Sequence, residues 1–206
     1  MDIATDRPAP NHHADHPGFS GISGELFAAL FALAGRRKAR TVAQIAGVRP
    51  GDHLVDVGCG SGPAVRAALR RGATADGVDP SSTMLAVARR LTRPGRPARW
   101  RVGTAESIPV ADGAATVVWS VATVHHWQDV VAGLAEAHRV LRPGGRLLAV
   151  ERRIAPDADG LASHGWTEAQ AESFATASRA AGFSDVEVQT HPLGKTTQLV
   201  VRAQRP

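Results

Sequence analysis

Three glycines at alternating positions interrupt the stretch from Leu54 to Pro63, directly after a short apolar run. Glycine lets a backbone turn tightly and approach a ligand closely, at Gly58, Gly60 and Gly62 alike. The helix expected to start at Pro63 adds free amides as donors. About twenty residues further along, Asp79 ends a second apolar run, where a carboxylate can accept hydrogen bonds from both hydroxyls of a ribose. The spacing therefore predicts a site for a ribose-containing ligand.

Histidines form a second group of residues that could do chemistry. His125 and His126, followed by Trp127, come after another apolar run. Histidine can act as a base near neutral pH, but the pair could equally shape a pocket or pack a loop. His16 and His164 could converge with the pair, even around a metal. No H-x-x-x-H spacing occurs among them, so loop or surface positions are the favoured interpretation and no metal site is expected.

Alternating strands and helices must position these residues. Strands are expected at 53–57, 74–78, 99–102, 114–120 and 146–151, with helices after the first, second and fourth of them, at 63–71, 81–91 and 128–141. The last of these helices is expected to bury Val131. Such succession predicts a parallel sheet covered on both faces, with right-handed crossovers.

The chain changes pattern after Glu151. A helix at 167–181 precedes two strands, at 186–190 and 197–202, whose connection is too short for a parallel crossover. The fold class is therefore α/β, a doubly wound, mostly parallel seven-stranded sheet with an antiparallel last strand. One domain of 206 residues is expected, divided into an N-terminal arm and helical lid (1–46), a ligand-binding core (47–151) and the C-terminal part (152–206).

Composition excludes several classes of protein. The net charge of +5 comes from scattered basic residues, which biased composition explains better than a nucleic-acid interface. No apolar run approaches the length of a membrane span, and the N-terminus lacks the features of a signal peptide. Cys59 is the single cysteine, so no internal disulfide can form. We expect a cytoplasmic monomer or homodimer that binds no nucleic acid and no membrane.

The spacing of the glycines also separates two classes of nucleotide site. A dinucleotide fingerprint needs a glycine where Pro63 stands. The pattern instead resembles the first motif of class I, Rossmann-like S-adenosylmethionine-dependent methyltransferases. Four segments recur in that family's order and extend the resemblance over about residues 45–205: Val55–Gly62, Gly77–Pro80, Gly103–Pro109 and Val140–Leu148.

The resemblance is greatest to the ubiquinone/menaquinone-biosynthesis-like group, which acts mostly on small molecules. It implies transfer of a methyl group from S-adenosylmethionine to an unidentified small molecule by direct displacement, on a Rossmann-like methyltransferase fold. One alternative is a protein that binds S-adenosylmethionine without catalysis. The other is a nicotinamide-dependent oxidoreductase, which Pro63 and the antiparallel end disfavour.

The same resemblance assigns the residues that would hold the cofactor. Asp56 would serve the methionine amino group, Gly58, Gly60 and the Cys59 backbone would line methionine and ribose, and Asp79 would bind the ribose. The remaining cofactor residues are Pro80 and Met84 beside the adenine, Ala105 and Glu106 at its edge, and Ser120, whose carbonyl would face the methionine ammonium.

The acceptor side is assigned to the end of the fourth strand. His125 and His126 are the candidate catalytic residues, and the candidate pocket residues are His16, Phe19, Trp127 and Glu151. Glu151 could instead pair with Arg152 or Arg153. The segment 152–165 is shorter than the usual covering insertion of the related group, so residues 12–31 are expected to fold over the cleft. The alternative places this segment on an outer face.

Overall fold

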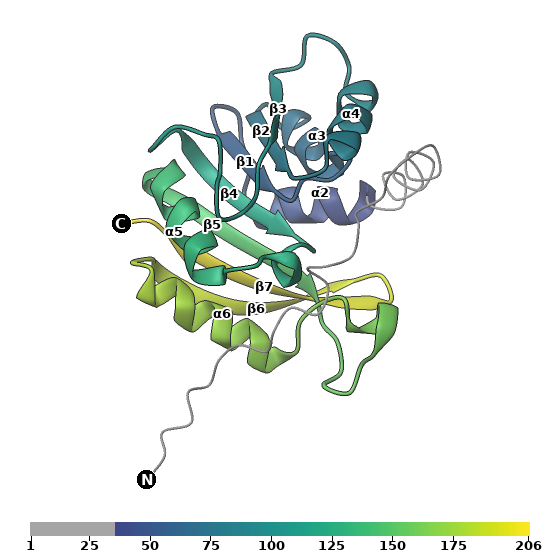
Figure 1. Ribbon diagram of the computed structural model, residues 1–206, viewed down its shortest axis with the longest axis vertical. Coiled ribbons are helices and arrows are strands. Elements are labelled where there is room, and N and C mark those ends of the chain that lie inside the picture. The colour runs from purple at the N-terminus through teal and green to yellow at the C-terminus, as the bar shows by residue number, and fades with distance from the viewer. Residues whose placement is uncertain (1–35) are drawn as a thin grey trace.

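A seven-stranded sheet organises residues 36–206, the part of the chain that the computed structural model describes (Figure 1). The strands are β1 (His53–Val57), β2 (Thr74–Asp79), β3 (Ala98–Val102), β4 (Ala115–Val121), β5 (Leu141–Arg152), β6 (Ser184–Leu193) and β7 (Thr196–Gln204). Their order is β3-β2-β1-β4-β5-β7-β6, and β7 runs antiparallel to both of its neighbours. The predicted fold class is confirmed. Because β1 pairs with both β2 and β4, the strand order reverses beside β1, where α/β sheets bind ligands.

Helices cover both faces of the sheet (Figure 1). One face carries α2 (Arg36–Ile45), α3 (Pro63–Leu69) and α4 (Ser82–Leu91), and the other carries α5 (Val130–Val140) and α6 (Glu168–Ala180). Each face has its own cluster of buried apolar side chains, exemplified by Val65 and Leu85 on the first and by Leu134 and Phe174 on the second. Two short 3-10 turns, η1 (Val124–His126) and η2 (Gly160–Ser163), lie in the connections after β4 and β5.

Side-chain caps fix where three of the helices begin, and so where the preceding loops end. The Ser81 hydroxyl accepts from an amide in the first turn of α4, and the Asp129 carboxylate does the same for α5. Thr167 and Gln170 form a reciprocal capping box at the start of α6. Gly182, with φ of +90°, follows that helix in the left-handed conformation that commonly ends helices.

One residue of α5 is not buried as predicted. Val131 was expected to be buried, yet it is 69% exposed. Leu134, Ala137 and Val140 form the buried face of the helix, and Val131, in its first turn, lies outside that face. The prediction for Val131 was therefore wrong.

Some expectations concern parts of the chain for which no structure is described. The proposed cover at residues 12–31, together with His16 and Phe19, lies outside residues 36–206. Within the described part, no helix combines the length and the apolar character needed to cross a membrane.

Candidate active site

The loop from β1 to α3 has the unusual backbone that its glycines predicted. Gly58, Gly60 and Gly62 have φ angles of +74°, +52° and +74°, a region that side-chain-bearing residues adopt only at a cost. The amides of Gly58 and Cys59 both donate to the Val78 carbonyl, at 2.8 and 3.0 Å. These bonds hold the loop against the end of β2.

The three glycines differ in what surrounds them. A Cβ on Gly58 would lie 2.6 Å from the Thr123 hydroxyl, and a Cβ on Gly62 would overlap the indole of Trp100. A Cβ on Gly60 would meet no atom within 4 Å. Gly58 and Gly62 are therefore required by packing, whereas Gly60 borders open space where a ligand can approach.

Asp79 clamps this loop from the end of β2. Its Oδ2 accepts from the Gly60 amide at 2.8 Å, and its Oδ1 accepts from the Ser81 amide at 2.9 Å. Burial raises the pKa of the Asp79 carboxyl above its usual value. Each carboxylate oxygen can accept more than one hydrogen bond, so the clamp leaves Asp79 able to accept from ligand hydroxyls as well.

Asp56 is a buried acid near the same loop. It is 1% exposed, and its Oδ2 has no hydrogen-bond partner in the described structure. Burial raises the pKa of Asp56 to about 8, against the lowering effect of the nearby Trp119 indole, and the Asp79 charge adds to the rise. A buried polar atom without a partner calls for a missing donor, and the ammonium group of a methionine moiety is a donor of suitable charge.

The side chains of Cys59 and Trp100 lie next to the backbone of the glycine loop. The Cys59 thiol belongs to the buried cluster around α3, where burial raises its pKa, so only the backbone of Cys59 is available to a ligand. Trp100, on β3, lies where a Cβ on either Gly62 or Gly77 would stand. Trp100 belongs to no motif in the sequence, and the only signal for it was the glycine at both positions, which leaves room for a bulky neighbour.

The candidate adenine residues lie in the segments that follow β2 and β3. Glu106 Oε1 accepts from the backbone amides of Gln128 and Asp129, at 2.8 and 3.1 Å. The side chain therefore ties its own loop to the start of α5. The other members of the predicted set are exposed Pro80 and half-buried Met84 near the start of α4, and buried Ala105.

A residue that the sequence analysis left unassigned connects this region with the end of β4. The Thr123 hydroxyl donates to the Val57 carbonyl at 3.0 Å and pairs with the Ser120 hydroxyl. Ser120 itself is 1% exposed. The preceding Ala122 has φ of +59°, so the turn after β4 is strained at a residue that is not glycine. Thr123 thus joins the end of β4 to the glycine loop.

Glu151 fixes the first histidine of the pair. It is fully buried at the end of β5, where its Oε1 accepts from the Val124 amide at 2.8 Å. Its Oε2 lies 3.0 Å from His125 Nδ1. The partner of Glu151 is thus His125, next to the candidate catalytic His126. Arg153 pairs with Glu168 instead.

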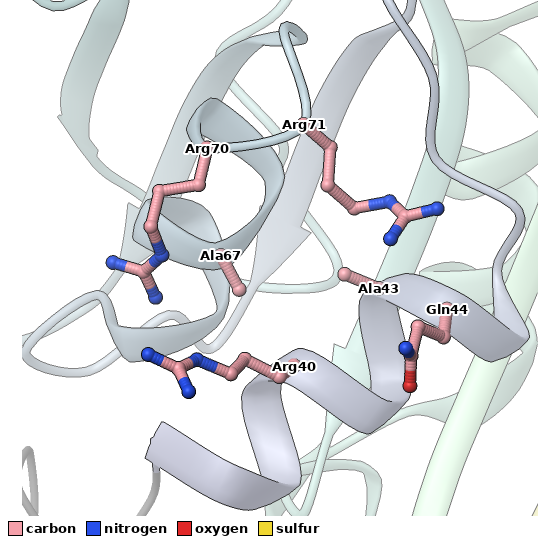
Figure 2. A pocket seen from close by; sticks show the side chains of 6 residues that line it. All are labelled: Arg40, Ala43, Gln44, Ala67, Arg70 and Arg71. Atoms are coloured by element: carbon pink, nitrogen blue, oxygen red, sulfur yellow. The ribbon is translucent and has the colours of Figure 1, made fainter.

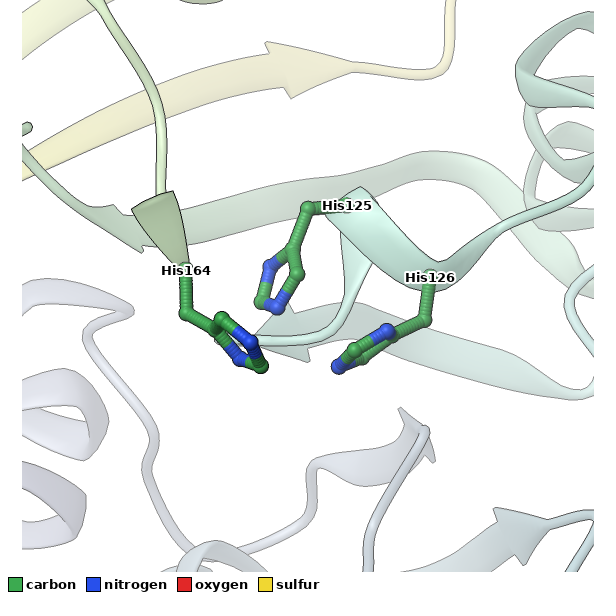
Figure 3. A group of neighbouring side chains, drawn as sticks. All are labelled: His125, His126 and His164. Atoms are coloured by element: carbon green, nitrogen blue, oxygen red, sulfur yellow. The ribbon is translucent and has the colours of Figure 1, made fainter. Parts of the chain in front are cut away.

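The structure also gathers a third histidine at this point (Figure 3). His164, in the segment after β5, lies with its ring centroid 5.4 Å from that of His125 and 5.8 Å from that of His126. The ring centroids of His125 and His126 are 4.0 Å apart. The short segment 152–165 therefore reaches the two histidines that follow β4.

Trp127 lies on the core side of the same turn. Its indole is 7% exposed, and its ring would collide with a Cβ placed on Gly133 of α5. It meets the Phe174 ring edge-on at 6.1 Å. The side chain is thus anchored beneath α5.

A separate pocket between α2 and α3 lies elsewhere in the molecule. Figure 2 shows its lining, which includes Arg40, Arg70 and Arg71. Arg70 and Arg71 follow the C-terminal end of α3, whereas the glycine loop precedes its N-terminal end. This pocket is therefore distinct from the candidate active site.

Comparisons with known proteins agree with this geometry. Residues 55–149 match the family model described as a methyltransferase domain. A demethylmenaquinone methyltransferase of Tropheryma whipplei is 33% identical over 112 residues, covering 54% of this chain and 46% of the relative. A 27-O-demethylrifamycin SV methyltransferase of Amycolatopsis mediterranei is 34% identical over 118 residues, covering 55% and 43%. The matched part is thus less than half of either relative.

Solved structures share the fold. A S-adenosylmethionine-dependent methyltransferase from Aquifex aeolicus superposes with a TM-score of 0.72 at 17% identity, covering 88% of this chain and 98% of the other. Together, the reversed strand order, the glycine loop and these matches agree. The fold is that of class I, Rossmann-like S-adenosylmethionine-dependent methyltransferases, and residues 55–149 are similar to the methyltransferase domain family, including relatives named for ubiquinone and menaquinone biosynthesis.

Proposed function

We propose that this protein transfers a methyl group from S-adenosylmethionine to a small molecule by direct displacement, leaving S-adenosylhomocysteine. The observation that carries the proposal is the open space at Gly60, bordered by a carboxylate whose Oδ2 holds the Gly60 amide. The cofactor supplies a methyl group on a positively charged sulfur. The residues of the chain bind it, orient it and position the acceptor.

The residues at the glycine loop suit the two ends of this cofactor. Asp56 offers an unpartnered buried oxygen to the methionine ammonium, and Asp79 offers its remaining lone pairs to the ribose hydroxyls. The backbone of Gly58, Cys59 and Gly60 is assigned to the methionine and ribose parts of the cofactor. The adenine end is assigned to Pro80, Met84, Ala105 and Glu106, and the Ser120 carbonyl to the ammonium.

The acceptor side is assigned to the turn after β4. His125 is held by buried Glu151, so its ring has one defined orientation rather than several. His126 lies beside it and is more exposed. The two relatives above are named for different acceptors, a demethylmenaquinone and a demethylrifamycin, so neither name identifies the acceptor of this chain.

The alternatives predict different ligands or different outcomes. A nicotinamide-dependent oxidoreductase would need a glycine where Pro63 begins α3. A binding protein without catalysis would hold S-adenosylhomocysteine but would form no methylated product.

Two measurements test the proposal. Calorimetry should detect binding of S-adenosylhomocysteine but not of NAD. Small molecules that copurify with the protein, identified by mass spectrometry, should then be screened with S-adenosylmethionine carrying a tritiated methyl group. Binding of NAD alone would refute the proposed function, and binding of S-adenosylhomocysteine without labelled product from any copurified compound would favour the non-catalytic alternative.

A further inference from the structure

Three imidazoles from two distant segments converge beside the end of β4 (Figure 3). His125 and His126 belong to η1, and His164 follows η2. One nitrogen from each ring can be chosen so that all three lie within 4.8 Å of one another. Two nitrogens on one tetrahedral zinc ion lie about 3.3 Å apart, because zinc–nitrogen bonds are about 2.0–2.1 Å long, so the rings need to close by at most about 1.5 Å for one ion to contact all three.

The hydrogen bonding of His125 indicates which of its two ring nitrogens can bind an ion. Glu151 can only accept as a carboxylate, so His125 Nδ1 donates to it and the Nε2 lone pair remains. That Nε2 is buried and has no hydrogen-bond partner in the described structure. A carboxylate behind one ring nitrogen and a metal on the other is the usual arrangement of a metal-binding histidine.

We propose that His125, His126 and His164 bind a divalent transition-metal ion of the zinc type. Imidazole ligands suit zinc, copper, iron and nickel, whereas magnesium and calcium prefer oxygen ligands. Three protein ligands leave one position for another molecule, as in catalytic rather than structural zinc sites. Glu151 acts here as a positioning residue, since it touches His125 and not the ion.

The ion would also define the class of acceptor, a step that rests on the proposed function. A divalent cation lowers the pKa of an oxygen acid beside it, so a phenol, an enol or a similar hydroxyl fits the fourth position. The hydroxyl proton leaves to solvent, and an electron pair of the oxygen forms the new bond to the methyl carbon. The carbon–sulfur bond breaks with its electron pair going to sulfur, which gives a methyl ether and S-adenosylhomocysteine.

Metal binding is testable without the acceptor. Full-length, tag-free protein is stripped with a chelator and titrated with Zn²⁺ by calorimetry, and the visible spectrum of the Co²⁺-loaded protein is recorded. We expect about one ion per chain and a cobalt spectrum typical of a nitrogen-rich site of low coordination number. His164→Ala should weaken zinc binding at least about a hundredfold and abolish that spectrum. Glu151→Gln should weaken it by about 10–100-fold.

Control variants separate this site from other histidines. His191→Ala removes a histidine of β6 outside the cluster, and replacing His12, His13 and His16 together by Gln removes the histidines of the N-terminal arm. Both variants should bind zinc like the parent protein. Zinc binding that survives His164→Ala, or that disappears with the arm histidines, would overturn the proposal. Circular dichroism checks that each variant is folded.

The outcomes also separate this inference from the proposed function. Binding of S-adenosylhomocysteine without zinc binding would overturn the metal site alone. Zinc binding without binding of S-adenosylhomocysteine would support the metal site and overturn the proposed function. His164→Ala should leave the affinity for S-adenosylhomocysteine unchanged, because His164 lies with the acceptor-side histidines.

Discussion

Replacing Gly60 with alanine should weaken cofactor binding far more than it weakens the fold. The new Cβ would meet no protein atom within 4 Å, so the main cost to folding is the φ angle of +52°. A left-handed conformation costs an alanine about 1 kcal/mol. The same Cβ would enter the space assigned to the ligand. A loss of about 1.4 kcal/mol of binding free energy corresponds to a tenfold loss of affinity.

Gly62→Ala is the matched control in the same loop. Its φ of +74° carries a similar conformational cost, but its Cβ would also overlap the Trp100 indole. Overpacking of a core adds about 1–3 kcal/mol, so the total loss should be about 2–4 kcal/mol. Gly62→Ala should therefore lose more stability than Gly60→Ala. Gly60→Ala, by contrast, should lose more affinity for the ligand.

The assays are denaturant titration for the free energy of unfolding and calorimetry for the affinity of S-adenosylhomocysteine. Gly60→Ala should lose about 1 kcal/mol of stability and at least about tenfold in affinity. If Gly60→Ala binds the ligand as tightly as the parent protein does, the open space at Gly60 is not where the ligand lies. That result would remove the observation on which the proposed function depends.

Three further variants test other parts of the site. Asp79→Ala should lower the affinity for S-adenosylhomocysteine at least about tenfold, since charge-assisted hydrogen bonds are worth about 1.5–3 kcal/mol. The control Asp76→Ala, which removes a buried acid of β2 paired with Arg101, should reduce stability but not affinity, and equal affinities for the two variants would contradict the ribose assignment. The raised pKa of Asp56, about 8, means that the folded protein retains a proton that the unfolded chain releases, so stability should fall as the pH rises from about 4 to about 8, by at most about 1.4 kcal/mol per pH unit. Asp56→Asn should make the free energy of unfolding less dependent on pH in this range. If the parent protein and the variant show the same pH dependence, the pKa of Asp56 is not raised. Deletion of residues 1–20 should leave cofactor affinity intact and abolish turnover if the N-terminal segment covers the acceptor side, whereas normal turnover would rule out the cover.

The sequence predicted those features whose signals are local. Apolar runs ending in glycine or aspartate located the strands, and the short connection between the last two strands required an antiparallel pair, as β6 and β7 show. The spacing after the glycine loop pointed to Asp79, and the structure places its carboxylate on the Gly60 amide. These signals lie within a few residues of the elements that they specify.

Contacts between distant segments were not predictable in the same way. Thr123 packs against Gly58 because β4 pairs with β1, and Trp100 lies over the glycine loop because β3 pairs with β2. His164 joins His125 only through the course of the loop after β5, which no periodic pattern encodes. The meeting of His125, His126 and His164 depends on that loop, so no spacing along a single segment of the sequence predicts it.

The hydroxyl of Thr123 has a consequence for any attempt to change the acceptor. It donates a hydrogen bond to the carbonyl of Val57, at the end of the strand before the glycine loop. The Thr123 side chain also occupies the space beside Gly58. A chimera that imports residues 120–127 from a protein of the same fold would therefore disturb the glycine loop unless Ser120 and Thr123 are kept. If the proposed function holds, substrate range is best altered after position 123 and in the segment 152–165, where new side chains can be introduced without moving the glycine loop.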